Sequence, residues 1–468
     1  MGITIVQKSD LGKPRPRASR ALILAGGAIT GGSFMAGGIK ALNDYLVGST
    51  VNDFDIFVGI SSGSILAAPL AGGISPESML KSLDGTSRHF SQLTAWHCYR
   101  PNVSEIVLKP VKFFLGAAMW LPGGIVRLAQ RHGEWKHGLL GSIWQFVLEP
   151  SRQSYDEMMG PLLDVLSEGD IPSLFAMLPS GLFDNSPIEA YIRENIERNR
   201  LTNDFEEAEK YAGKRLYISA MRLDGARRVV FGPGEELSLT ISEAIQASTA
   251  LPGFYKPARI NGVDYVDGGV QETANIDTAV DKGAKLIVCY NPFRPYDAEQ
   301  FVEGMSRRRK SGKRLATDGI ATVLNQILRA FFHARLAVAL KRFRDDPAFD
   351  GDIILIEPRA GDEAFFSLNP LLLRNRIAAA KLGFESARAS IEKHFDEISG
   401  IMAAYGIKMS RAGVEEEYKK MARPGVSERE IQRLLEGREK RARAKAEAKV
   451  KAKAKVKVEA KVKKRKAR

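Results

Sequence analysis

Short apolar runs alternate along this chain with longer segments in which small and apolar residues recur at helical spacing. The runs predict buried strands at 21–27, 54–60, 215–221, 227–232, 284–292 and 352–358. The segments between them predict helices at 31–46, 64–73, 238–250, 317–344 and 375–398, and residues 181–196 predict a helix that opens after Ser186-Pro187. Because repeated strand, turn and helix units are typical of parallel sheets, we expect an α/β fold with a mainly parallel sheet flanked by helices.

Local signals refine this pattern. Asn261-Gly262 tolerates positive φ at both turn positions, so residues 256–269 predict a β-hairpin. Ser186 stands directly before a proline and predicts the N-cap of the helix that follows. Residues 96–180 are rich in Trp, Gly and apolar residues without a clear period, and they predict an irregular insertion over the sheet.

Changes in composition divide the chain into segments of different character. We expect a polar N-terminal arm (1–20), an α/β domain (21–293) with an insertion or lid (96–180), a C-terminal helical extension packing on the core (294–405), and a linker with a Lys/Ala-rich basic tail (406–468). The tail is of low complexity, so we expect it to be solvated and disordered.

The positive charge of the chain is concentrated in this tail. The formal net charge is +14 over 468 residues, and residues 438–468 alone contain sixteen Lys or Arg and three Glu. Such charges are attracted to anionic bilayers, and to nucleic acid without sequence preference. We therefore expect peripheral contact with anionic membranes through the tail and only non-specific binding of nucleic acid. A tail that merely keeps the protein in solution remains an alternative.

The sequence also bears on the compartment. Cys98 and Cys289 lie far apart and predict neither a disulfide framework nor a metal site, which favours a reducing compartment. The first residues lack the apolar region of a secretory signal. The apolar segment 113–126 is interrupted by Pro122-Gly123-Gly124 and is too short to span a bilayer, so it fits a lid that dips into lipid or a core segment equally well. We expect a cytoplasmic protein with peripheral membrane contact.

The strand at 54–60 runs into Gly59-Ile60-Ser61-Ser62-Gly63, and a helix follows directly. A sharp turn between a strand and a helix lifts a serine hydroxyl out of the sheet, and Gly59 and Gly63 let the backbone fold tightly beneath it. This context makes Ser61 a candidate nucleophile. A plain Gly-Ser turn with a capping serine is the alternative.

A serine nucleophile needs a base, and two types of residue can supply it. None of the six histidines follows a strand in the order of a Ser-Asp-His triad, although a triad that uses His394 stays possible. Asp267 follows a strand of the predicted hairpin, and Gly268 and Gly269 leave no side chain to obstruct a partner. A buried carboxylate can accept the serine proton directly. The alternative for Asp267 is an ordinary Asp-Gly turn.

A glycine-rich turn follows the first strand of the predicted domain. It comprises Gly26, Gly27, Ala28, Ile29, Thr30 and Gly31, called the glycine loop below. Backbone N–H groups in such a turn can hold the oxyanion of a tetrahedral intermediate if they point at the space above Ser61. The spacing does not match a dinucleotide-binding turn, although the loop alone could also bind phosphate or serve helix packing.

In combination, the loop, the serine turn and the distant Asp-Gly-Gly resemble the patatin-like phospholipases. The segments 181–188 and 247–257 and the strand after the aspartate extend this resemblance over residues 21–293. It implies a patatin-like α/β fold and a Ser–Asp dyad that cleaves acyl esters without a metal or cofactor. Ser61 would be the nucleophile and Asp267 the base. The backbone of the glycine loop would form the oxyanion hole, with Gly59, Gly63, Gly268 and Gly269 as support.

The glycine loop departs from the family pattern. The family's loop usually reads Gly-Gly-Gly-x-Arg-Gly, whereas this chain has no basic residue between Gly26 and Gly31. Which amides act as donors is therefore open.

From the sequence we therefore expect a serine acyl-ester hydrolase of the phospholipase or lipase type, acting on a lipid or other acyl ester. Two alternatives differ in class. One is a non-catalytic scaffold of the same fold that binds nucleic acid or anionic surfaces through its tail, and the other is a histidine-dependent triad esterase.

Overall fold

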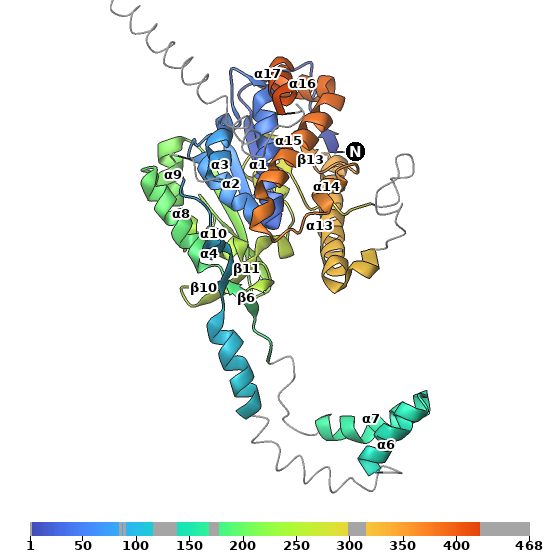
Figure 1. Cartoon of the computed structure of the whole chain (residues 1–468). Helices are drawn as coiled ribbons and strands as arrows, with labels where there is room; N and C mark the ends of the chain where they lie inside the picture. Colours follow the sequence, from blue (N-terminus) through green and yellow to red (C-terminus); the bar gives the residue numbers. More distant parts are fainter. Residues whose placement is uncertain are drawn as a thin grey trace, which may run out of the picture. The chain divides into compact units, whose positions relative to one another are not determined.

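A computed structural model describes residues 2–83, 87, 90–115, 138–167, 177–297 and 315–421 (Figure 1). The chain forms two compact units. The first comprises Met1–Arg100, Asn185–Pro252 and Pro257–Arg468, and the second Pro101–Asp184 and Gly253–Lys256. The basic tail and most of the apolar segment 113–126 lie outside the described residues.

The first unit is built on one large sheet. Among the described residues its strand order is β1-β13-β12-β2-β4-β7-β11-β10, and β8 pairs with β7. The strands are β1 (Ile3–Gln7), β2 (Ser19–Leu24), β4 (Ile56–Ile60), β7 (Arg215–Arg222), β8 (Arg227–Phe231), β10 (Ala258–Ile260), β11 (Val263–Asp267), β12 (Ala284–Tyr290) and β13 (Asp352–Ile356). The central neighbours from β13 to β7 pair in parallel, and the outer strands pair antiparallel. The predicted mainly parallel α/β fold is thus confirmed.

Helices accompany this sheet, and most of them lie where the hydrophobic pattern predicted helices. They include α1 (Ala28–Tyr45), α2 (Ser62–Ala71), α3 (Pro76–Ser82), α8 (Ser186–Arg198), α9 (Phe205–Ala212), α10 (Ile241–Thr249), α11 (Ile276–Asp281), α13 (Ile320–Asp345), α15 (Arg376–Lys393) and α16 (Phe395–Ala404). α1 and α15 lie side by side (Figure 1). A Cβ at Gly37 would overlap Ala380, and one at Gly383 would overlap Phe34, so glycine permits this close approach.

Side chains from neighbouring strands and from α13 share one buried core. The cluster includes Ile23, Val58, Ile287, Leu355, Leu336 and Leu340. α13 also exposes apolar side chains on its other side, among them Ile320, Phe331 and Val338. Within the described residues, Thr322–Asp345 is long and apolar enough to cross a membrane by length and composition, and 17% of its most apolar window is buried. A single helix of this kind is weak evidence, because core helices of soluble proteins pass the same test.

Three local predictions need correction. Residues 3–7 form β1 at the edge of the sheet rather than part of a polar arm, with Ile3 and Val6 buried. Asn185, not Ser186, is the N-cap residue of α8, and its side chain makes no capping hydrogen bond. Its Nδ2 donates to the Gln246 carbonyl and to Thr249 Oγ1. The helix predicted over 375–398 is interrupted at His394, where α15 ends and α16 begins.

The second unit contains regular structure where an irregular insertion was predicted. Residues 103–115 are helical, and α6 (Gly138–Leu148) and α7 (Arg152–Ser167) follow. β6 (Gly181–Asp184) pairs in parallel with β9 (Gly253–Tyr255). Apolar residues in α6 recur at helical spacing and are exposed: Leu140, Ile143, Trp144, Val147 and Leu148. The interspersed glycines and prolines of the insertion concealed this period in the sequence.

Candidate active site

Ser61 occupies a strained turn between β4 and α2. Its backbone has φ 53° and ψ −129°, a combination that residues with a Cβ rarely adopt. Gly59 and Gly63 leave no room for side chains beneath the turn. A Cβ at Gly59 would lie 2.9 Å from the Cβ of Ala67, and one at Gly63 would lie 2.6 Å from the carbonyl oxygen of Ala25. The close approach of α2 to β4 and β2 therefore requires both glycines.

Hydrogen bonds from three serines hold this turn in place. The Ser61 N–H donates to Ser248 Oγ at 2.8 Å, and Ser248 Oγ donates to the carbonyl of Ser219 at 2.6 Å. Ser64 Oγ donates to the Ser61 carbonyl at 2.6 Å. Each bond is buried, so the strained backbone of Ser61 is tied to α10 and to β7 as well as to its own helix.

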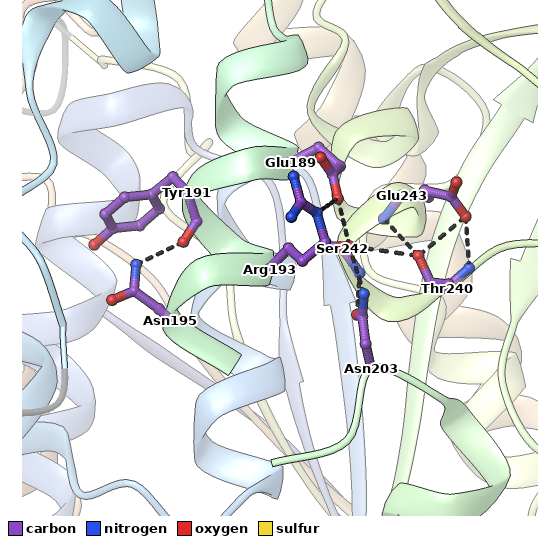
Figure 2. Close-up of polar contacts among 8 residues, drawn as sticks. All are labelled: Glu189, Tyr191, Arg193, Asn195, Asn203, Thr240, Ser242 and Glu243. Carbon is purple, nitrogen blue, oxygen red and sulfur yellow. Dashed lines mark hydrogen bonds and ion pairs between the residues drawn. The ribbon is translucent and has the colours of Figure 1, made fainter. Parts of the chain in front are cut away.

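α10 carries Ser248 near its C-terminal end, and polar contacts fix its N-terminal end (Figure 2). Thr240 and Glu243 form a capping box. Ser242 Oγ donates to Glu189 on α8 at 2.9 Å, and the Ser242 N–H donates to Asn203 Oδ1 at 2.9 Å. These contacts position the helix whose far end supports Ser61.

Asp267 ends β11 at the level of Ser61. Ile60 pairs with Ser219 on β7, and Asp267 pairs with the next residue, Ala220. Because β11 runs antiparallel to β7, it ends at Asp267 beside the serine turn. The Gly269 N–H donates to Asp267 Oδ1 at 2.8 Å. The Ser61 hydroxyl lies close enough to the Asp267 carboxylate to lower its pKa.

Burial changes the acidity of this carboxylate. Asp267 is 4% exposed, and the loss of hydration raises its pKa to about 6, although the nearby Ser61 hydroxyl and the Gly269 N–H lower it. A Cβ at Gly268 would overlap the Ser219 carbonyl, which explains the need for glycine directly after the acid. Asp267 is therefore basic enough to accept a proton and close enough to take it from Ser61.

The glycine loop lies against the same serine. A Cβ at Gly26 would be 3.2 Å from Ser61 Cβ. α1 begins at Ala28, three residues earlier than predicted, and Ala28 has φ 52°. The Ile29 and Thr30 N–H groups both donate to the Pro370 carbonyl at 3.1 Å. Within the described part of the chain, no hydrogen bond is recorded for the N–H groups of Gly26, Gly27 or Ala28.

The histidines that the structure describes make their contacts with groups other than Ser61. His97 contacts Thr94, and His333 contacts Glu357 at 3.2 Å. His394 stands next to Phe395, whose ring packs on Tyr45 at the C-terminal end of α1. Because Ser61 lies at the other end of α1, and a helix rises 1.5 Å per residue, the two are separated by about 25 Å. His89, His132 and His137 are outside the described residues.

Two supporting groups were not identified from the sequence. Ser248 lies within the segment 247–257 that carries the family resemblance, but nothing in the segment indicates that its hydroxyl accepts from Ser61. Pro370 acts through its backbone carbonyl, which has no sequence signal at all. Among the described residues, His, Cys, Asp and Glu side chains form no cluster of three or more that could bind a metal ion.

Comparisons with known proteins place this site in context. The uncharacterized protein YjjU of Escherichia coli K12 is 32% identical over 99 residues, which are 20% of this chain and 27% of YjjU. VipD from Legionella pneumophila is 16% identical, with 84% of this chain and 70% of VipD covered and a TM-score of 0.35. ExoU from Pseudomonas aeruginosa is 16% identical, with 92% and 72% covered and a TM-score of 0.26.

The structural likenesses are too distant to carry an argument, and the matched part of YjjU is about a quarter of that protein. The family model is decisive. A model described as patatin-like phospholipase matches residues 22–280, more than half of the chain, and spans the glycine loop, Ser61 and Asp267. The chain belongs to the patatin-like phospholipase family, as its motifs predicted.

Proposed function

We propose that this protein is a serine acyl-ester hydrolase of the phospholipase or lipase type, with Ser61 as nucleophile and Asp267 as base. The observation that carries the proposal is the proximity of the Ser61 hydroxyl to a buried carboxylate: the hydroxyl is close enough to lower the pKa of Asp267, which burial raises to about 6. Family membership supports the reaction class. A cytoplasmic location and peripheral membrane contact through the basic tail belong to the same proposal.

The reaction begins with proton transfer between these two side chains. Ser61 Oγ attacks the ester carbonyl carbon while its proton passes to the Asp267 carboxylate. The carbonyl π electrons move to oxygen, which gives a tetrahedral oxyanion. The C–O bond to the alcohol then breaks, and the alcohol leaves with the proton from Asp267. An acyl-Ser61 ester remains.

Water completes the cycle in the reverse order. The water oxygen attacks the acyl carbon while Asp267 accepts a proton from the water. Ser61 Oγ then leaves with that proton, and a carboxylic acid is released. Both steps need the ionised form of Asp267 at the start, so a pKa near 6 leaves most molecules ready at neutral pH. Burial makes this carboxylate a stronger base than one in water.

The N–H groups of Gly26, Gly27 and Ala28 are the proposed oxyanion donors. The position of Gly26 beside Ser61 supports this role, as does the lack of a recorded partner for all three N–H groups in the described chain. Ile29 and Thr30 are less suited, because their N–H groups already donate to Pro370. Gly31 is also engaged, since its N–H donates to the Gly27 carbonyl at 2.9 Å.

The proposal is tested by turnover and covalent labelling together. We expect the full chain to hydrolyse a soluble chromogenic short-chain ester, and an organophosphonate to stop turnover at one equivalent. Peptide mass spectrometry should then find the phosphonyl group on Ser61. A protein that shows neither turnover nor labelling would favour the scaffold alternative, and a label on a different serine would remove Ser61 from its role.

The triad alternative makes a separate prediction. Because His394 lies near the other end of α1 from Ser61, we expect His394→Ala to retain the turnover of the wild type within about twofold, the range typical of distant surface changes. Steady-state kinetics on the same ester provide the measurement. Loss of turnover in a folded His394→Ala protein would support the triad instead.

A further inference from the structure

The wall of the glycine loop is built by residues beyond the family match, which ends at residue 280. A Cβ at Gly27 would lie 2.6 Å from Pro292 Cγ, and one at Gly26 would lie 3.4 Å from the ring of Phe293. On the other side, the Pro370 carbonyl accepts from two N–H groups in the first turn of α1. Such groups have no partner inside a helix, so Pro370 fixes the start of α1 relative to the loop.

Pro292 and Phe293 stand in a turn that directly follows β12, the strand next to β2. Asn291 begins this turn and is fully buried. Its Oδ1 accepts from the Phe293 N–H at 3.1 Å, and its Nδ2 donates to Glu357 at 2.8 Å. Its own N–H donates to the Ile356 carbonyl at 2.9 Å. One end of the turn is therefore tied to β13.

Arg329 of α13 holds the other end. Its Nη1 donates to the carbonyls of Pro292 at 3.2 Å and Arg294 at 3.3 Å. The guanidinium carbon lies 5.6 Å from the ring centroids of three aromatic residues, Phe293, Phe365 and Phe366. These distances are typical of cation–π contacts. A single side chain thus links both carbonyls of the turn to the aromatic residues around it.

Burial of this guanidinium costs free energy, because the charge loses its hydration. Arg329 is 4% exposed, and within the described residues no acidic side chain is recorded as its partner. A buried charge without a counterion needs compensation, which here comes from the carbonyls and the rings. Burial lowers its pKa to about 10, so it stays charged at neutral pH. Helix packing alone would favour an apolar residue at this site.

We propose that Arg329 is a positioning residue for the oxyanion hole. It fixes the Pro292–Phe293 turn against Gly26 and Gly27, so that the N–H groups of the glycine loop stay directed at the position of the oxyanion. The active site of this chain therefore includes a part of its C-terminal extension. This inference rests on the proposed function, because it concerns the donors of the same reaction.

The test compares Arg329→Met and Arg329→Lys with wild type in the full chain. We expect Arg329→Met to lower kcat about 100-fold with little change in KM, since small misplacements of catalytic groups have effects of this size. Arg329→Lys keeps the charge but cannot reproduce the guanidinium geometry that bonds both carbonyls. Its kcat should therefore lie between those of Arg329→Met and the wild type. Arg342→Met, an exposed change on the same helix, is the matched control and should behave as wild type.

A second readout separates positioning from general destabilisation. An aryl trifluoromethyl ketone forms a tetrahedral adduct whose oxyanion occupies the same donors. Its affinity should fall in Arg329→Met by about the same factor as kcat, in line with loss of transition-state binding. Should Arg329→Met fail to fold, Phe366→Leu offers a milder change, because it removes one of the three aromatic rings around the Arg329 guanidinium. It should lower kcat and ketone affinity together, by less than is expected for Arg329→Met.

The outcomes distinguish this inference from the function on which it rests. A wild type that hydrolyses ester, an inactive Ser61→Ala protein and an Arg329→Met protein with normal kcat and ketone affinity would overturn the inference alone. Retained turnover in Ser61→Ala would overturn the proposed function. A fall in thermal stability without a fall in ketone affinity, in either Arg329→Met or Phe366→Leu, would assign Arg329 a purely structural role.

Discussion

Asp267→Asn should abolish ester hydrolysis and raise the free energy of unfolding at neutral pH. Activity is lost because an amide cannot accept the Ser61 proton, and we expect kcat to fall by about 1,000-fold or more, the range seen when a general base is removed. The side chain keeps its shape, and its Oδ1 can still accept from the Gly269 N–H. Steady-state kinetics and denaturant unfolding provide the two measurements.

The gain in stability follows from the raised pKa. The carboxyl group has a pKa of about 6 in the folded protein against an ordinary value of 3.8, so folding disfavours its charged form. The penalty is fully present above pH 6, shrinks as the pH falls through this range and vanishes below about 4. A shift of this size corresponds to about 3 kcal/mol as an upper value. The amide introduced by Asp267→Asn carries no charge at any of these pH values, so the stability advantage of the variant should follow the same profile.

Wild-type turnover should show the same titration. Only the ionised carboxylate accepts a proton, so kcat/KM should rise with pH around an apparent pKa near 6 and level off above it. Asp264→Asn is the control, because Asp264 lies on the same strand and pairs with Arg259 at 3.0 Å. We expect it to keep activity and to change stability little, as removal of an exposed ion pair does. An active Asp267→Asn protein would exclude Asp267 as the base.

Ser61→Ala should also eliminate turnover, with a loss of about 1,000-fold or more in kcat, because no other hydroxyl would form the acyl-enzyme. The folded structure should persist, since the Ser61 N–H keeps its bond to Ser248. Retained affinity for the trifluoromethyl ketone is not expected, because the ketone needs the Ser61 oxygen for its adduct. Circular dichroism should match that of the wild type.

Ser61→Gly separates the strain of the turn from its chemistry. The φ of 53° and ψ of −129° are accessible to glycine but unfavourable for alanine or serine. We expect Ser61→Gly to be as inactive as Ser61→Ala but more stable than it by about 1 kcal/mol, the usual cost of such backbone strain. Equal stability of the two variants would show that the turn is relaxed in solution.

The order of the elements and the candidate chemistry could be predicted from the sequence alone. Apolar runs and glycine turns predicted the parallel strands because burial on both faces leaves a strong periodic signal. The Asn261-Gly262 hairpin was predicted for a related reason. Both residues have positive φ in the structure, and few other dipeptides tolerate it. Ser61, Asp267 and the glycine loop were identified because their motifs combine residue types that rarely coincide.

The tertiary structure decided what depends on pairing register and on backbone groups. The short edge strand β1 was missed, since five residues give too little periodicity to stand out from a polar segment. That Asp267 stops beside Ser61 depends on the antiparallel register of β11 on β7, which no local pattern specifies. The contributions of Ser248, Pro370 and Arg329 come from contacts between residues far apart in the chain. Such contacts arise only once the sheet has brought its strand ends together, because a carbonyl or a buried guanidinium acquires its role from its neighbours rather than from its position in the sequence.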